Sequence, residues 1–91
     1  MAFILASYKV ADYGGWKAIF DEDHAGRSGA VKHHQIFQAV NDPNHVFIGL
    51  EFSSAQDASA FHQRLSASGV LEGLTIESAP TVVELADEQT Y

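Results

Sequence analysis

The hydrophobic and polar positions of the chain predict four strands separated by two helices. Apolar runs, or a strict alternation of apolar and polar residues, are typical of strands and occur at residues 2–10, 30–40, 45–52 and 74–85. Apolar residues at helical spacing occupy the two longer gaps between these segments. The order β-α-β-β-α-β predicts a ferredoxin-like α+β fold, in which both helices cover one face of a four-stranded antiparallel sheet.

The first helix is predicted to begin at Asp12 and to end at Gly26 or Gly29. Asp12 is a good N-cap, because its carboxylate can accept hydrogen bonds from the free backbone amides of the first turn. Either glycine can end the helix in a left-handed conformation. The helix then presents one apolar stripe to the sheet, formed by Tyr13, Trp16, Ile19 and Phe20.

The second helix is predicted to begin at Ser53 and to end at Gly69. Ser53 is followed three residues later by Gln56, a spacing that matches a capping box. Gly69 supplies a left-handed C-terminal cap. The apolar positions of this helix are Ala58, Phe61 and Leu65.

Turn chemistry at Asn41–Asn44 predicts a hairpin between the second and third strands. Pro43 fixes its own backbone dihedral for a tight turn, and Asn and Asp tolerate the remaining positions. A turn over these residues would pair His34 with Glu51, either as an acid/base pair or as a polar pair in an interface. The more apolar face, which we assign to the helices, would then carry His33, Gln35, Phe37, Leu50 and Phe52.

The predicted sheet has one uncovered face. Right-handed crossovers place the first and third strands in the centre and the other two at the edges, where Pro80 is tolerated. Ile4 and Leu5 point to opposite faces of the first strand, and we expect the middle of this strand to be buried on both. Because helices cover only one face, a second copy packed sheet on sheet would cover the other. We therefore expect a homodimer.

Length and charge limit the class of protein. The 91 residues, of which 46% are hydrophobic, suit one domain over residues 1–91 with an acidic tail at 86–91. The net charge of −7, without a cluster of Lys or Arg, argues against nucleic-acid partners and anionic membranes. The absence of cysteine excludes disulfides and thiolate sites and suits the cytoplasm. We expect neither a signal peptide nor a membrane span, because the apolar start stops at Ser7.

The stretch Val10–Asp21, which reads VADYGGWKAIFD, resembles the opening V-x-D-(Y/F)-x-x-W-x-x-x-F-D of small dimeric α+β barrel proteins. The turn at Asn41–Asn44, the strand ending at Leu50–Phe52 and the pair Ala58 and Phe61 resemble their hairpin and second helix. The resemblance implies a ferredoxin-like protomer whose sheet forms a barrel with that of a second subunit.

This superfamily includes antibiotic biosynthesis monooxygenases that need no cofactor, small polyketide cyclases, lactone isomerases and haem-degrading enzymes. The resemblance implies an active cleft between helices and sheet in each protomer. Tyr8 stands where many relatives carry a histidine in the first strand. Trp16 lies on the first helix, so the residue set of the haem-degrading members is not matched.

Histidines are the candidate bases, because their side chains change charge near neutral pH. His33 or His62 would take a proton from an acidic phenol or carbon, and Gln35 or Tyr8 would steady the resulting oxyanion. His24 continues the stripe of the first helix, where it acts either as a base at the cleft mouth or as a cation at the helix end. The remaining candidate ligand-binding residues are aromatic: Trp16, Phe37, Phe52 and Phe61.

Each candidate also has a purely structural interpretation. His33 and Gln35 can form local hydrogen bonds or reach solvent at the edge of the sheet, and His62 can lie at the surface of its helix. Tyr8 and Trp16 can be core residues. The chain lacks H-x-x-x-H and H-E-x-x-H motifs, so a site formed by His24, His33 and His62 is the remaining arrangement for a metal, and we expect neither metal nor cofactor.

Three functions follow from this pattern. The first is a cofactor-free monooxygenase, cyclase or isomerase acting on an aromatic or polyketide-like small molecule. The second is a carrier or sensor that binds such a ligand without turnover. The third is a structural dimer in which side chains fill the cleft: Trp16, Phe20, Phe61 and Leu65.

Overall fold

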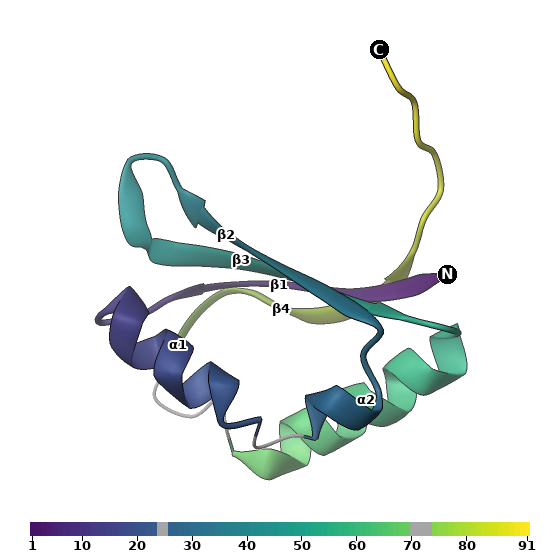
Figure 1. Cartoon of the computed structure of the whole chain (residues 1–91), viewed down its shortest axis with the longest axis horizontal. Coiled ribbons are helices and arrows are strands. Elements are labelled where there is room, and N and C mark those ends of the chain that lie inside the picture. Colours follow the sequence, from purple (N-terminus) through teal and green to yellow (C-terminus); the bar gives the residue numbers. More distant parts are fainter. Residues whose placement is uncertain (24–25, 70–73) are drawn as a thin grey trace.

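A computed structural model of the chain describes residues 1–23, 26–69 and 74–91. The elements follow in the order β1 (Ala2–Lys9), α1 (Tyr13–Asp21), the 3-10 helix η1 (Arg27–Gly29), β2 (His33–Ala39), β3 (Asp42–Phe52), α2 (Ala55–Ser68) and β4 (Thr75–Glu84). All strand pairs are antiparallel, in the order β2-β3-β1-β4. Figure 1 shows that α1 and α2 lie on the same side of the sheet. The predicted ferredoxin-like α+β fold, with β2 and β4 at the edges, is therefore confirmed.

The core lies between the sheet and α2. Alternate residues of β1 and β3 point toward the helices and are buried, from Ala2 to Tyr8 and from Val46 to Phe52. Phe61 of α2 packs on Phe52 with their ring centroids 5.5 Å apart. By contrast, no residue of α1 is buried, and its Trp16 packs only partly against the core. The sheet is thus held mainly by α2, and α1 is the more loosely seated helix.

The beginning of α1 is as predicted, but its end is not. Asp12 caps the helix by accepting a hydrogen bond from the Gly15 amide, with a nitrogen to oxygen distance of 2.9 Å. The helix stops at Asp21, well before either glycine proposed to end it. Gly26, at φ 73°, instead provides the left-handed residue that begins η1. The predicted glycine cap of α2 is confirmed, because Gly69 has φ 78°.

The hairpin between β2 and β3 has a different register from the predicted one. The turn consists of Val40 and Asn41, and Ala39 pairs with Asp42 beside it. The next pair is Gln38 with Val46, so the residues between Asp42 and Val46 have no partner in β2. This bulge shifts the alignment of the whole hairpin by one residue relative to the prediction.

Asn44, in the middle of the bulge, explains why β3 carries extra residues there. Its side-chain oxygen accepts a hydrogen bond from the Tyr13 amide at 2.9 Å, and its side-chain nitrogen donates to the Ala11 carbonyl at 3.3 Å. Its backbone carbonyl accepts from the Val10 amide at 2.8 Å. Asn44 therefore fastens the connection between β1 and α1, and the strand bulges to place it there.

The register shift exchanges the two faces of β2. His33, not His34, lies opposite Glu51, and His34 lies opposite the buried Leu50. His33, Gln35 and Phe37 therefore lie on the face without helices, contrary to the prediction. His34 lies on the helix-covered face instead.

The uncovered face of the sheet is apolar at its centre. Leu5 is 50% exposed, Phe37 54% and Phe47 40%. The Leu5 side chain lies against Gly49. A Cβ atom added to Gly49 would be 3.5 Å from Cδ2 of Leu5. The expectation that the middle of the first strand is buried on both faces is therefore wrong for a single protomer.

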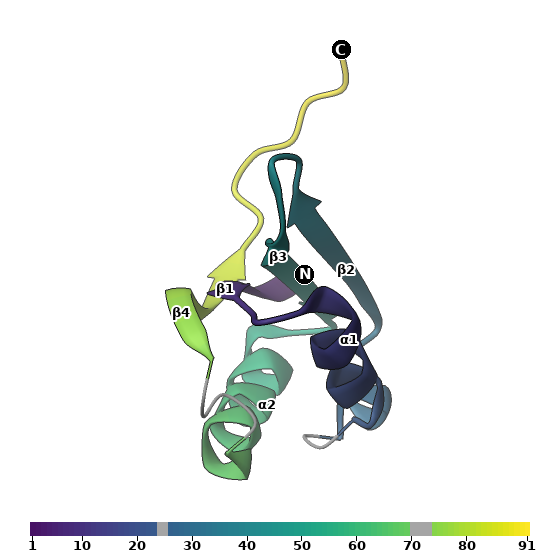
Figure 2. The ribbon, with the colours of Figure 1, turned by 90° about the vertical axis from the view of Figure 1, so that its left-hand side faces the viewer.

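The last residues, from Leu85 to Tyr91, form neither helix nor strand and are exposed. Figures 1 and 2 show that this C-terminal tail leaves the sheet on the side opposite the helices. Among the described residues, no helix is both long and apolar enough to cross a membrane.

The N-cap of α2 allows a direct test of the structure against the sequence prediction. Ser54, rather than the predicted Ser53, accepts a hydrogen bond from the Asp57 amide at 3.1 Å. We expect Ser54→Ala to lower the free energy of unfolding by about 1 kcal/mol, because the amide loses its acceptor. Ser53→Ala should change it by less than about 0.5 kcal/mol. Urea denaturation followed by circular dichroism measures both, and a larger loss in Ser53→Ala would contradict the cap assignment.

Candidate functional site

A groove opens on the helix side of the molecule, between the segment from Ser28 to Lys32 and helix α2. Its volume is about 580 Å³. The side of the groove formed by the chain before β2 includes Ala30 and Val31, and the opposite side belongs to α2. The lining residues are Ser28, Gly29, Ala30, Val31, Lys32, Ser53, Asp57, Ala60, Phe61 and Arg64. The groove is thus lined about equally by polar and apolar groups, and its charged residues are Lys32, Asp57 and Arg64.

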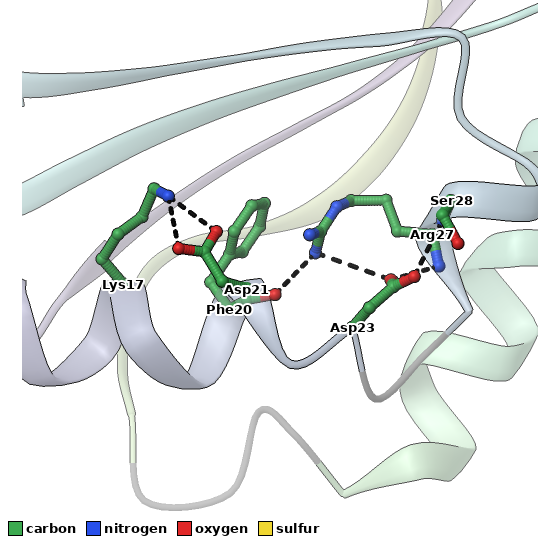
Figure 3. Close-up of polar contacts among 6 residues, drawn as sticks. All are labelled: Lys17, Phe20, Asp21, Asp23, Arg27 and Ser28. Carbon is green, nitrogen blue, oxygen red and sulfur yellow. Dashed lines mark hydrogen bonds and ion pairs between the residues drawn. The ribbon is translucent and has the colours of Figure 1, made fainter.

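One wall of the groove is held in place by Asp23. This residue adopts a left-handed conformation with φ 60°, directly after the end of α1. Its carboxylate accepts hydrogen bonds from the backbone amides of Arg27 and Ser28, which fixes the start of η1 (Figure 3). The hydrogen bond from Ser28 is the main cause that lowers the pKa of the Asp23 carboxyl below its usual value. The early stop of α1 and this turn together set the position of Ser28 in the groove.

Arg27 and Lys17 each have partners on α1 or in the segment that follows it (Figure 3). The Arg27 guanidinium lies 3.7 Å from the centre of the Phe20 ring and donates to the Phe20 carbonyl at 3.0 Å. It also lies 3.8 Å from the Asp23 carboxylate. Lys17 donates to both oxygens of Asp21, at 2.6 and 2.8 Å. The charges of both cations are therefore already compensated.

Two further cations line the groove without such compensation. Among the described residues, the ion pairs involve Lys17 and Arg27, whereas neither Lys32 nor Arg64 has a carboxylate partner. The Arg64 guanidinium lies over the ring of Phe61, 5.4 Å from its centre. Among the described residues that line the groove, Asp57 provides the one carboxylate.

His34 is the β2 histidine on the helix-covered face, and sequence reasoning placed it on the other one. Its ring meets the edge of Phe20 with centroids 5.3 Å apart. Partial desolvation lowers the pKa of His34, and the positive charge of Arg27 lowers it further. His34 therefore stays neutral at physiological pH. The bulge at Asn44 is what brings His34 to this face. The residues around Asn44 favour a turn and a bulge equally, so the sequence alone does not reveal the position of His34.

Four of the predicted ligand-binding residues lie on the helix side, but only Phe61 lines the groove. Tyr8 is 4% exposed, and burial raises the pKa of its phenol to about 12. It remains a neutral hydrogen-bond donor at any physiological pH. Trp16 stacks between Tyr13 and Phe20 along α1, and Phe52 is buried beneath Phe61.

The structure does not bring the predicted catalytic residues together. His33, Gln35 and Phe37 lie on the uncovered face, on the other side of the sheet from Tyr8. His62 donates from Nε2 to the Pro80 carbonyl at 2.9 Å, and this bond ties α2 to β4. His24 lies outside the described residues.

A shared metal site is also not formed by the predicted residues. His33 and His62 are on opposite sides of the sheet, so one ion cannot bind both. Within the part of the chain that the structure describes, no group of three or more His, Cys, Asp or Glu side chains is arranged to hold a metal ion.

A second histidine contact, which sequence reasoning missed, lies on the uncovered face. The Ser7 hydroxyl and His45 Nε2 are hydrogen bonded at 2.9 Å. The His45 ring stacks on Phe47 with centroids 4.5 Å apart. Ser7 is buried beneath these side chains although its face carries no helix.

Comparison with solved structures identifies the fold. A Nitrosomonas europaea protein with a provisional assignment as an antibiotic biosynthesis monooxygenase matches with a TM-score of 0.60 and 16% identity, over 90% of this chain and 83% of its own. An antibiotic biosynthesis monooxygenase matches with a TM-score of 0.59 and 12% identity, over 98% of this chain and 100% of its own. No protein-family model and no curated protein matches the chain.

The chain therefore has the fold of antibiotic biosynthesis monooxygenases. The predicted resemblance is confirmed for the fold, and at this level of identity the likeness concerns the fold alone.

The environment of His34 predicts how this residue titrates. We expect its NMR titration midpoint to lie below the ordinary value of 6.5. Because the unfolded chain then binds more protons than the folded one just below pH 6.5, His34 makes the unfolding free energy fall as the pH drops through that range. Arg27→Gln should raise the midpoint, since it removes a nearby positive charge, whereas Lys9→Gln should leave it unchanged. A midpoint that does not move in Arg27→Gln would refute this account of His34.

Proposed function

We propose that this protein binds one small aromatic or polyketide-like molecule in the groove beside α2 and oxidises it with molecular oxygen, without a cofactor. The observation that carries the proposal is the groove itself, whose volume of about 580 Å³ suits such a molecule. Ala30 and Val31, which are both partly exposed, offer apolar contacts to the ring system. The likeness to antibiotic biosynthesis monooxygenases supports this reaction class.

The proposed reaction converts an activated methylene group into a carbonyl group. The methylene carbon loses two hydrogens and gains one oxygen atom, and the other oxygen atom of O2 leaves as water. Molecular oxygen is the oxidant, and the electrons come from the ionised substrate. The methylene group first loses a proton to solvent, and the resulting carbanion supplies the electrons to O2. A proton returns when the second oxygen atom leaves as water, so no net proton is consumed or released. The groove contributes binding and orientation of the substrate.

The second candidate function is ligand binding without turnover. It is favoured by the composition of the groove, because no histidine is among its described lining residues. Of the predicted bases that the structure describes, His33 lies on the other sheet face and His62 is hydrogen bonded to β4. A carrier needs the groove alone, without a group that moves a proton.

Filling the groove tests both functions. Ala60 lines the groove on α2, whereas Ala67 is exposed on the same helix and does not line it. We expect Ala60→Trp to lower oxygen uptake on anthrone or naphthol substrates by about tenfold or more, because the indole occupies the ligand's place. Ala67→Trp should retain the original rate.

Oxygen uptake measured with an electrode, together with chromatography of the product, checks this prediction. Equal rates in Ala60→Trp and Ala67→Trp would contradict the groove as the active site. A ligand-induced rise in melting temperature that Ala60→Trp abolishes, without oxygen uptake by the unmodified protein, would favour the carrier.

We further propose that the active form is a homodimer in which the uncovered sheet faces pack on each other. Exposed Leu5, Phe37 and Phe47 form an apolar surface at the centre of this face, which water would otherwise contact. The C-terminal tail leaves on the same side (Figure 2), so it is placed to reach a second copy. In such a dimer the Ser7 and His45 pair would lie inside the interface.

A charge placed at the centre of this face should separate the protomers. Leu5 is 50% exposed on the sheet, and Ile19 is 53% exposed on α1. We expect Leu5→Glu to weaken dimerisation about a hundredfold or more, because the carboxylate would be buried unpaired. Ile19→Glu should not change it. Sedimentation velocity at micromolar concentration measures both, and a native protein that sediments as a monomer would refute the dimer.

A further inference from the structure

We propose that the groove recognises its ligand as an anion: a planar aromatic molecule with an ionised phenol, carboxyl or sulfonate group held by Lys32 and Arg64. This inference rests on the groove assigned under the proposed function, and it adds the charge of the ligand. It does not depend on whether the bound molecule is oxidised.

The distribution of cations is the first argument. The chain has 5 basic residues against 12 acidic ones and a net charge of −7. Lys17 and Arg27 are paired with carboxylates, and Lys9 is exposed at the end of β1. The other two, Lys32 and Arg64, both line one groove and have no carboxylate partner among the described residues. In an acidic protein, two uncompensated cations on one groove favour an anionic ligand there.

The position of Arg64 is the second argument. Its guanidinium lies over the buried ring of Phe61, 5.4 Å from the ring centre. This contact places the guanidinium beside the groove, and its rigid planar fork loses little side-chain entropy for each hydrogen bond it donates to a ligand. A guanidinium offers two parallel donors, which match the two oxygens of a carboxylate or sulfonate.

The start of α2 supplies the third argument. Ser53 and Asp57 of the lining flank the helix N-terminus, where the helix dipole favours negative charge. The Asp57 carboxylate already occupies part of this field and repels a second anion. The groove therefore holds two cations and one anion among its described lining residues, and its affinity for an anion should increase when Asp57 loses its charge.

Fluorescence titration with anilinonaphthalene sulfonate tests the proposal, with the uncharged N-phenylnaphthylamine as the matched probe. We expect Lys32→Gln and Arg64→Gln each to weaken binding of the sulfonate by about five- to tenfold, and binding of the uncharged probe by less than twofold. Asp57→Asn should tighten binding of the sulfonate. Lys17→Gln makes the same charge change outside the groove and should have no effect.

The site of probe binding is controlled separately, because apolar probes also bind exposed sheet faces. Ala60→Trp should abolish sulfonate binding, whereas Leu5→Glu on the uncovered face should not. Equal loss in Lys17→Gln and Arg64→Gln, or sulfonate binding that survives in Ala60→Trp, would overturn the proposal.

The failure of this inference is distinguishable from the failure of the proposed function. Oxygen uptake on anthrone that is unchanged in Lys32→Gln and Arg64→Gln would overturn the anion preference and leave the monooxygenase intact. Sulfonate binding that depends on Lys32 and Arg64, without oxygen uptake on any substrate, would support the anion site in a protein that is not an oxygenase.

Discussion

The hydrogen bonds of one residue, Asn44, determine how the two faces of this sheet are used. Asn44 joins β3 to the connection between β1 and α1 through three bonds, and β3 bulges to bring it there. The bulge sets the alignment of β2 with β3 and so decides which histidine of β2 meets the helices. His34 thereby comes to lie against Phe20, and His33 lies on the face without helices.

The two helices contribute differently to the core on the covered face of the sheet. Helix α2 buries Ala58 and Phe61 and closes the core, whereas α1 buries none of its residues. The chain after α1 is fixed by hydrogen bonds of Asp23 and Arg27, and Ala30 and Val31 beyond them pack against the core. A groove remains where this polar corner faces α2, since neither side supplies enough apolar side chain to fill it.

The sequence predicted the order of elements, the strand order and the Asp12 and Gly69 caps, because each depends on local chemistry or on handedness. It did not predict the register of the hairpin, which depends on a contact between Asn44 and residues more than thirty positions earlier. The predicted face of His33 and Gln35 was wrong for the same reason, because the observed register places both residues on the uncovered face of the sheet. The groove residue Lys32 precedes β2 and Arg64 belongs to α2, and no spacing in the sequence links them.

Pro80 and its neighbours make the β4 edge a poor place for another strand to add. Proline has no amide proton to donate, and its carbonyl is already bound to His62. The pairing of β4 with β1 is also irregular on either side of Ser7, which twists this edge. Growth of the sheet by edge-to-edge addition is therefore blocked on this side. Self-association is directed away from open-ended, fibre-like assembly and toward contacts that close after a single partner.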